Sequence, residues 1–369
     1  MVKRNILLNP GPATTTDTVK QALVVPDICP REAEFGNLMQ EIRKDLVKIA
    51  RGDENYTTIL FTGSGTAAMD SAISSVVPPN KKILILINGS YGVRFAEIAK
   101  TYNIDVVELN FEFGKKIELD KIKSILQADK NIECVAVTHH ETTVGILNPI
   151  KEIGAIAKKY NKTFIVDTIS SFAGVPINIK EFNIDFMMST SNKCIQGMAG
   201  IAFIICSKKA LEKLKSIKAR NYYLDLYKQY EYLEKNNQTR FTPPVQIMYA
   251  LKQAINEFYE EGADNRFKRY RENYKVLKEG LKKLGFKFLM GEDVTESNIL
   301  TTIYYLDHPN FDFDMLHDKL YKRDFTIYPG KITELNTFRI AVMGAIYPED
   351  IRNFLESLKE VLIEMDIIK

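Results

Sequence analysis

Three features stand in a fixed order along the chain, and together they define a chemistry. The first is Gly63-Ser64-Gly65-Thr66, which follows an apolar run and opens a helix-like stretch. Glycine lets the backbone approach an anion, and the unpaired amides at a helix start point toward it, so the segment is a candidate phosphate-binding loop. It matches neither a dinucleotide-binding nor an ATP-binding glycine motif. An ordinary tight turn between a strand and a helix explains the segment at least as well.

The second and third features are an acid and a lysine that follow later strands. Asp167 ends the run Thr163-Phe164-Ile165-Val166, where side chains of a parallel sheet project into the binding crevice, although it could equally cap the next turn. Lys193 follows 26 residues later, just past another strand end. A lysine held in a cleft has a lowered pKa and forms a Schiff base with an aldehyde. Taken alone, Lys193 is explained more simply as an exposed loop residue.

Taken together, the three features meet the demands of pyridoxal 5′-phosphate. Its phosphate needs the loop, its aldehyde needs an amine, and its ring nitrogen needs a carboxylate that keeps it protonated. The sequence therefore predicts a site for this cofactor on one sheet, with Lys193 and Asp167 as its catalytic residues.

The elements that must position these residues alternate in type. Short β-branched runs alternate with helix-like stretches to about residue 220, which is typical of a parallel sheet with helices on both faces. Seven strands are predicted, at 57–61, 82–87, 106–109, 134–138, 164–166, 186–189 and 201–206. Helical spacing predicts helices at 152–159 and 211–218.

The remainder of the chain predicts a second domain. Its 369 residues exceed the roughly 250–300 at which one core stops growing. Long helices are expected at 243–262 and 264–285, then strands at 299–305, 325–328 and 338–342, and a closing helix from 348 to about 365. The predicted divisions are an arm at 1–15, a large cofactor domain at 16–245, and linking helices with a small domain at 246–369.

Composition excludes several classes of function. Fifty Lys and Arg against 47 Asp and Glu leave a net charge of +3, which gives no general reason to bind nucleic acid or an anionic membrane. No apolar run approaches the ~18 residues that span a bilayer. Four cysteines without Cys-x-x-Cys spacing predict reduced thiols and a cytoplasmic protein. His139 and His140 are adjacent and face opposite ways, so no metal site is predicted.

At these residues the chain resembles the class V aminotransferases of the fold-type I pyridoxal-phosphate enzymes, and within them the branch that uses 2-aminoethylphosphonate and pyruvate. The resemblance covers nearly the whole length. Eight segments carry it: Leu8-Asn9-Pro10-Gly11-Pro12, Gly63-Ser64-Gly65, Asn88-Gly89-Ser90-Tyr91-Gly92-Val93-Arg94, Glu141-Thr142-Thr143, Asn192-Lys193-Cys194-Ile195-Gln196-Gly197, Arg240-Phe241-Thr242, Tyr328-Pro329-Gly330-Lys331 and Phe338-Arg339-Ile340. It implies an α/β fold with a large, mainly parallel seven-stranded sheet and a smaller C-terminal α+β domain.

The resemblance also implies a role for each matching residue. Lys193 would bind the cofactor covalently, Asp167 would pair with its ring nitrogen, and Arg339 would bind the acid group of the substrate. The other implied contacts are Ser64, Gly65, Thr66 and Asn192 at the phosphate, Tyr91 stacked on the ring, Thr142 near the phenolic oxygen, and Thr242 at the phosphate of the neighbouring subunit. The last contact implies a homodimer with shared active sites. An ordinary packing role for Tyr91 in the protein core explains its presence about as well as stacking on the cofactor ring does.

The implied reaction is a transamination from 2-aminoethylphosphonate to pyruvate, which yields phosphonoacetaldehyde and L-alanine. The two substrates carry their acid groups at different distances from nitrogen, so a second cation beside Arg339 is expected, with Arg31, Arg94 and Lys331 as candidates. Asn9, Val144 and Ala341 depart from the family pattern in ways that bear on the substrate pocket. An alanine–glyoxylate or serine–pyruvate aminotransferase of the same class is the nearest alternative. A binding protein built on a retired enzyme fold is another.

Overall fold

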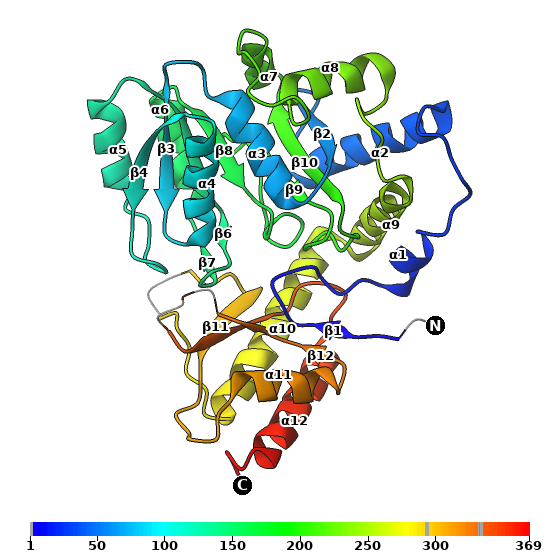
Figure 1. Ribbon diagram of the computed structural model, residues 1–369, viewed down its shortest axis with the longest axis vertical. Coiled ribbons are helices and arrows are strands. Elements are labelled where there is room, and N and C mark those ends of the chain that lie inside the picture. The colour runs from blue at the N-terminus through cyan, green and yellow to red at the C-terminus, as the bar shows by residue number, and fades with distance from the viewer. Residues whose placement is uncertain (1–2, 292–294, 331, 333–334) are drawn as a thin grey trace.

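A seven-stranded sheet forms the larger part of the molecule. The computed structural model describes residues 3–291, 295–330, 332 and 335–369 (Figure 1). The sheet order is β2(Tyr56–Thr62), β10(Ile201–Ser207), β9(Phe186–Thr190), β8(Thr163–Asp167), β5(Ile132–Thr138), β3(Lys82–Ile87) and β4(Asp105–Asn110). β10 runs antiparallel to both neighbours and the other pairs are parallel. The predicted α/β class and all seven predicted strands are confirmed.

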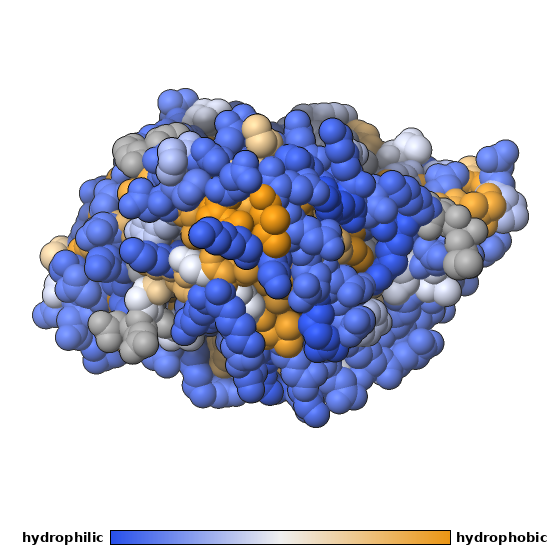
Figure 2. Space-filling model, turned by 90° about the horizontal axis from the view of Figure 1, so that it is seen from below, coloured by the Kyte–Doolittle hydropathy of each residue, from blue (hydrophilic) through white to orange (hydrophobic). Residues whose placement is uncertain are grey.

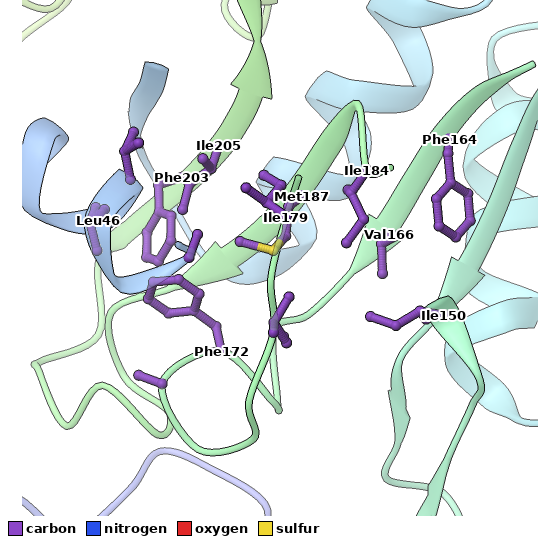
Figure 3. Packing of buried hydrophobic residues seen from close by; sticks show 14 of the residues in the cluster. Leu46, Ile150, Phe164, Val166, Phe172, Ile179, Ile184, Met187, Phe203 and Ile205 are labelled. Carbon is purple, nitrogen blue, oxygen red and sulfur yellow. The ribbon is translucent and has the colours of Figure 1, made fainter. Parts of the chain in front are cut away.

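Helices cover both faces of this sheet because its strands are apolar on both sides. Along β10, Phe203 and Ile205 belong to one core cluster, whereas Ala202 and Ile204 belong to the other. On the first face lie α2(Ala33–Ile49), α5(Leu119–Ala128), α6(Ile150–Lys159) and α9(Val245–Glu261); on the second lie α3(Gly65–Val76), α4(Ser90–Thr101), α7(Lys208–Leu214) and α8(Leu226–Asn236). Figure 3 shows the first cluster, in which Phe172 and Phe203 meet edge to face with ring centroids 5.2 Å apart.

One helix prediction is wrong in its bounds. The helix expected at 211–218 is α7, which begins at Lys208 and ends at Leu214. It starts earlier because the Ser207 side chain, at the end of β10, accepts a hydrogen bond from the backbone of Ala210 and caps the helix. The helix predicted at 152–159 is confirmed as α6.

A second, smaller sheet lies beyond the carboxyl ends of the large one (Figure 1). β14(Thr337–Ala341) lies between β11(Leu300–Tyr304) and β13(Tyr328–Pro329), antiparallel to both. Its core includes residues of α10(Ala263–Lys283), α11(Phe313–Tyr321) and α12(Pro348–Glu364). The predicted long helices are α9 and α10, and the predicted closing helix is α12.

The strand predicted at 325–328 is wrong as a single strand. Its first part, β12(Phe325–Thr326), pairs in parallel with β1(Ile6–Leu7), whereas its last residue begins β13 and pairs with β14. The chain changes partner at Ile327, whose side chain is fully buried between the two pieces. A strand from the other end of the chain therefore completes this region.

The N-terminal arm joins the small sheet to the lysine loop. After β1, the Leu8 carbonyl accepts a hydrogen bond from the Ala341 amide at 2.8 Å. Five residues later the Ala13 amide donates to the Asn192 carbonyl at 3.0 Å. A short helix, α1(Asp17–Gln21), follows. The domain boundaries at residues 15 and 245 stay predictions.

The surface opposite the large sheet is mostly hydrophilic. Seen from below, hydrophobic residues gather near the centre of that face and charged or polar residues surround them (Figure 2). In the described part of the chain, no helix combines the length and the apolar character needed to cross a membrane.

Candidate active site

The parallel strands bring the predicted residues to one edge of the sheet. β8 ends at Asp167, β9 ends three residues before Lys193, and β2 ends just before Gly63. Because these strands run in the same direction, their carboxyl ends meet on the side that faces the small sheet (Figure 1).

The candidate phosphate-binding loop has free donors. Ser64 is the N-cap of α3, but its exposed side chain makes no capping hydrogen bond, and the first amides of a helix have no acceptor within it. Arg94 donates from Nη1 to Thr66 Oγ1 at 3.2 Å, which adds a positive charge beside the loop. A Cβ on Gly65 would lie 2.8 Å from Ile169 Cδ1, so a larger residue there would require the Ile169 side chain to move. Free amides and a nearby guanidinium are groups that can bind an anion.

Lys193 lies under the N-terminal arm. Its Nζ donates a hydrogen bond to the Pro10 carbonyl, and a Cβ on Gly11 would come within 2.5 Å of the same nitrogen. Desolvation lowers the pKa of Lys193, and no carboxylate forms an ion pair with it among the described residues. A neutral amine is the form that attacks an aldehyde, so this environment favours the chemistry predicted for Lys193.

Asp167 is 2% exposed at the end of β8. Its Oδ1 accepts a hydrogen bond from the Ile169 amide at 2.8 Å, and Thr138 Oγ1 donates to Oδ2 at 3.5 Å. Burial raises the pKa of Asp167 to about 7, against the effect of the Ile169 amide. A protonated ring nitrogen placed against this carboxyl would stabilise its charged form.

Arg339, on β14, is buried and has no acidic partner among the described residues. It is 4% exposed, and it donates from Nε to the Pro329 carbonyl at 3.2 Å and from Nη1 to the Thr142 carbonyl at 3.1 Å. No ion pair of Arg339 occurs within the ranges that the structure describes. Burial lowers the pKa of Arg339, so an anionic ligand would relieve the cost of a desolvated charge.

Several buried polar atoms lack a hydrogen-bond partner in the described part of the chain, as expected where a ligand supplies one. They include Asn9 Oδ1, His140 Nε2 and Thr142 Oγ1. His140 Nδ1 lies 3.0 Å from the Ser170 carbonyl, which only accepts, so Nε2 carries the lone pair. Burial lowers the pKa of His140 to about 4. His139 instead contacts Ser171 Oγ at 2.9 Å, so the two rings have separate partners.

The remaining predicted residues lie at three places. Tyr91 is in the first turn of α4, with the Arg94 guanidinium 4.8 Å from its ring centroid. Asn192 Oδ1 accepts a hydrogen bond from Thr190 Oγ1 at 2.9 Å. Thr242 is exposed in the segment before α9.

The three candidates for a second cation beside Arg339 differ in their contacts. Arg94 is bound at the phosphate loop, as described above. Arg31 donates to Gln238 Oε1 at 3.0 Å and to the Thr239 carbonyl at 2.9 Å, which anchors the segment before Thr242. Lys331 lies outside the described residues.

Sequence reasoning missed Glu141, which is fully buried beside the predicted residues. It also missed Gly11, which has φ +118° and leaves room for Lys193. Both stood in segments that carried the family resemblance, and an acid directly after two histidines at a strand end was the available signal for Glu141.

The fold and this set of side chains define a pyridoxal-phosphate-dependent transferase: a loop for a phosphate, an amine for an aldehyde and an acid for a ring nitrogen. Thr142 Oγ1 has no hydrogen-bond partner among the described residues, and the first amides of α3 have no acceptor within the helix, so both fit that cofactor. Residues 19–321 match the family model described as aminotransferase class V. The chain belongs to the class V aminotransferase family.

Individual relatives are similar over most of the chain. A 2-aminoethylphosphonate–pyruvate transaminase of Lysinibacillus sphaericus is 42% identical, and the match covers 97% of each chain. A bifunctional phosphonoacetaldehyde hydrolase/aminoethylphosphonate transaminase of Clostridioides difficile is 40% identical over 97% of this chain, which spans 56% of that relative's length. Among solved structures, an alanine–glyoxylate aminotransferase from Nostoc sp. has a TM-score of 0.91 and 28% identity, and the match covers 98% of this chain and 96% of that one.

Proposed function

We propose that this protein transfers the amino group of 2-aminoethylphosphonate to pyruvate, which gives phosphonoacetaldehyde and L-alanine. The observation that carries the proposal is that Lys193 and Arg339 are both desolvated and have no acidic partner in the described structure. Lys193 lies at the sheet edge where Asp167 ends β8, and Arg339 reaches the Thr142 carbonyl from β14. One amine and one anion-binding guanidinium are what an acidic amino donor requires. The curated relatives described above are named for the same reaction.

The residues of this chain divide the chemistry among them. Bound at this site, the cofactor supplies an aldehyde and an electron-withdrawing ring. Lys193 would hold it and, once released, take the proton from the substrate carbon next to nitrogen. Asp167 would keep a proton on the ring nitrogen, and Arg339 would orient the substrate through its acid group. Tyr91 would cover one face of the ring, and Thr142 Oγ1 would donate to the phenolic oxygen.

The phosphate would lie at the start of α3. Ser64, Gly65 and Thr66 would hold it with amides and hydroxyls, and Asn192 would approach it from the lysine loop. Because Arg94 donates to Thr66 Oγ1, we assign Arg94 to this phosphate rather than to the substrate. Lys331 stays a prediction for the second cation near Arg339.

The partner of this site is a second copy of the chain. Thr242 is exposed and is preceded by Phe241, whose ring stacks on Tyr223 at 5.0 Å between centroids. Arg240 lies over the rings of Tyr222 and Phe241, and Tyr222 is 77% exposed. Exposed aromatic and arginine side chains are typical of interface centres, so this cluster supports a homodimer in which Thr242 reaches the neighbouring phosphate.

The unpaired cysteines support a cytoplasmic location for the protein. Cys134, Cys194 and Cys206 are buried free thiols and Cys29 is an exposed one. Unpaired thiols persist in a reducing compartment.

The visible spectrum of the purified protein tests the proposal. We expect a yellow protein whose absorption shifts on addition of 2-aminoethylphosphonate, and a Lys193→Ala variant that loses steady-state turnover by more than a thousandfold. With pyruvate as acceptor, alanine should form faster from 2-aminoethylphosphonate than from serine. With 2-aminoethylphosphonate as donor, turnover should be faster with pyruvate than with glyoxylate, which would give glycine. A colourless protein, or near wild-type turnover by the variant, would contradict it.

A further inference from the structure

Glu141 is a buried acid that the proposed chemistry does not use. Its side chain has no exposure to solvent. Oε2 accepts hydrogen bonds from the amides of Tyr91 at 3.1 Å and Gly92 at 3.4 Å. Oε1 accepts from Thr143, from its amide at 3.1 Å and from its hydroxyl at 2.6 Å. An ionised carboxylate offers about four acceptor positions, so these four donors fill it.

These bonds fasten the start of α4 to the 141–143 segment. The first amides of a helix find no acceptor within it, and its N-terminus carries a partial positive charge, so a carboxylate is the natural partner there. Thr143 Oγ1 adds a bond by accepting from the Ser90 amide at 3.0 Å. A Cβ on Gly89 would lie 2.2 Å from Glu141 Cδ, so the carboxylate occupies the space that glycine leaves.

Glu141 joins two elements that each carry a group of the site. Tyr91, on α4, has the ring predicted to lie over the cofactor, and its amide donates to Glu141. Thr142, which follows Glu141 in the chain, accepts a hydrogen bond from Arg339 Nη1 at its carbonyl, at 3.1 Å. A shift of Glu141 would therefore move the aromatic ring and the substrate-binding guanidinium together.

The charge of Glu141 also reaches the site. Burial is the main cause that raises the pKa of Asp167, and Glu141 adds to it. Burial lowers the pKa of Arg339, whereas the negative charge of Glu141 raises it. Glu141 is thus electrostatically coupled to both residues without touching either through an ion pair.

We propose that Glu141 is a positioning residue: its carboxylate sets the place of the Tyr91 ring against the cofactor and of the Thr142 carbonyl that holds Arg339. The inference rests on the proposed function for the role of the ring. Glu141 and Tyr91 are 50 residues apart in the sequence, and their hydrogen bond makes α4 part of the site.

A double-mutant cycle on cofactor affinity tests the proposal. Glu141→Gln keeps the size and shape of the side chain. It replaces one carboxylate oxygen by an NH2 group, which cannot accept the hydrogen bonds that the backbone amides donate to Glu141. We expect it to weaken pyridoxal 5′-phosphate binding about tenfold, as measured by spectral titration of the dialysed protein, and to raise KM for the amino donor. Combined with Tyr91→Ala, it should weaken binding less than twofold further, because both changes remove the same contact. Independent, multiplying effects would overturn the proposal.

The matched control is Asp225→Asn. Asp225 is also a buried carboxylate at a helix start, where it accepts from the Lys228 amide of α8 at 3.0 Å. We expect this variant to lose stability without a change in cofactor affinity. If Glu141→Gln does not fold, Thr143→Val removes the hydroxyl that donates to Glu141 and serves in the same cycle.

Amide hydrogen exchange separates this inference from the proposed function. In cofactor-free protein, Glu141→Gln should speed exchange at Tyr91 and Gly92 at least tenfold, whereas Asp225→Asn should leave those amides unchanged. Unchanged exchange in Glu141→Gln would overturn the positioning role whether or not the wild type binds the cofactor. If the wild type binds no cofactor but Glu141→Gln still exchanges faster than the wild type at Tyr91 and Gly92, only the proposed function is overturned.

Discussion

At the scale of single residues, Asp167 and Lys193 are both held away from their ordinary ionisation. Burial raises the pKa of Asp167 from 3.8 to about 7, and desolvation lowers the pKa of Lys193. Burial thus disfavours the charged form of both groups, and a charged partner bound beside either one would offset that cost. Such perturbed pairs are common at functional sites, and here geometry and pKa point to the same two residues.

The raised pKa of Asp167 makes stability depend on pH. Between pH 3.8 and about 7 the folded cofactor-free protein holds a proton that the unfolded chain has released, so the stability from this group is lost as the pH rises. We predict that the free energy of unfolding of the wild type, relative to that of Asp167→Asn, falls by roughly 3 kcal/mol from pH 4.5 to 7.5. Urea denaturation at several pH values measures the difference.

Comparison with Asp167→Asn is needed because other buried groups titrate in this range. Burial lowers the pKa of His139 to about 3 and that of His140 to about 4, which changes stability in the opposite direction as pH rises. These contributions are shared by both proteins and cancel in the difference. A constant difference across this range would contradict the raised pKa.

At the scale of elements, the N-terminal arm acts as a cover for the lysine loop. β1 pairs with β12 in a separate two-stranded sheet, and Gly11 lies against Lys193. Gly11→Ala should cost about 1–2 kcal/mol of stability, since φ is +118°. It should also displace Lys193 Nζ, because the added Cβ would lie 2.5 Å from it, and so slow cofactor loading more than tenfold. Thermal unfolding and the rate of colour development measure the two effects.

Gly285→Ala is the matched control for this prediction. Gly285 follows α10 with φ +86°, and a Cβ there would meet only Leu306 at 3.9 Å. It should lose similar stability but load cofactor normally. Equal loading by both variants would show that the arm does not position Lys193.

At the scale of the whole molecule, the active site is predicted to need two chains. Thr242 and the aromatic cluster beside it lie on the surface of one chain. We predict that Tyr222→Ser shifts the protein toward monomer at micromolar concentration and weakens cofactor binding at the same time. Sedimentation velocity and spectral titration measure the two.

Tyr321→Ser is the control for the dimer, since Tyr321 is 55% exposed on α11 in the small sheet region. It should change neither the mass nor the cofactor affinity. A monomeric Tyr222→Ser variant with full affinity would show that the site is complete within one chain.

The strands of the large sheet could be predicted from the amino-acid sequence, whereas the roles of the site residues stay predictions. The strands of the sheet interior were located because burial on both faces leaves a nearly continuous apolar run, whereas the edge strand β4 has no fully buried residue and was located by its β-branched run. Lys193 and Asp167 were predicted because they follow the loop at residues 63–66 in the order that the cofactor requires, whereas each residue taken alone has an ordinary structural explanation. The split of 325–328 was not predictable, since it depends on a partner strand from the opposite end of the chain.

The hydrogen-bond partners of the charged side chains could be read only from the folded structure. It placed Arg94 against Thr66, left Arg339 with carbonyl partners, and buried Glu141 at the start of α4. Each contact joins segments that are distant in the sequence, and local patterns carry no information on which distant donor meets which acceptor. The residue types therefore indicated the chemistry, whereas the contacts in the folded chain show which partner each side chain has.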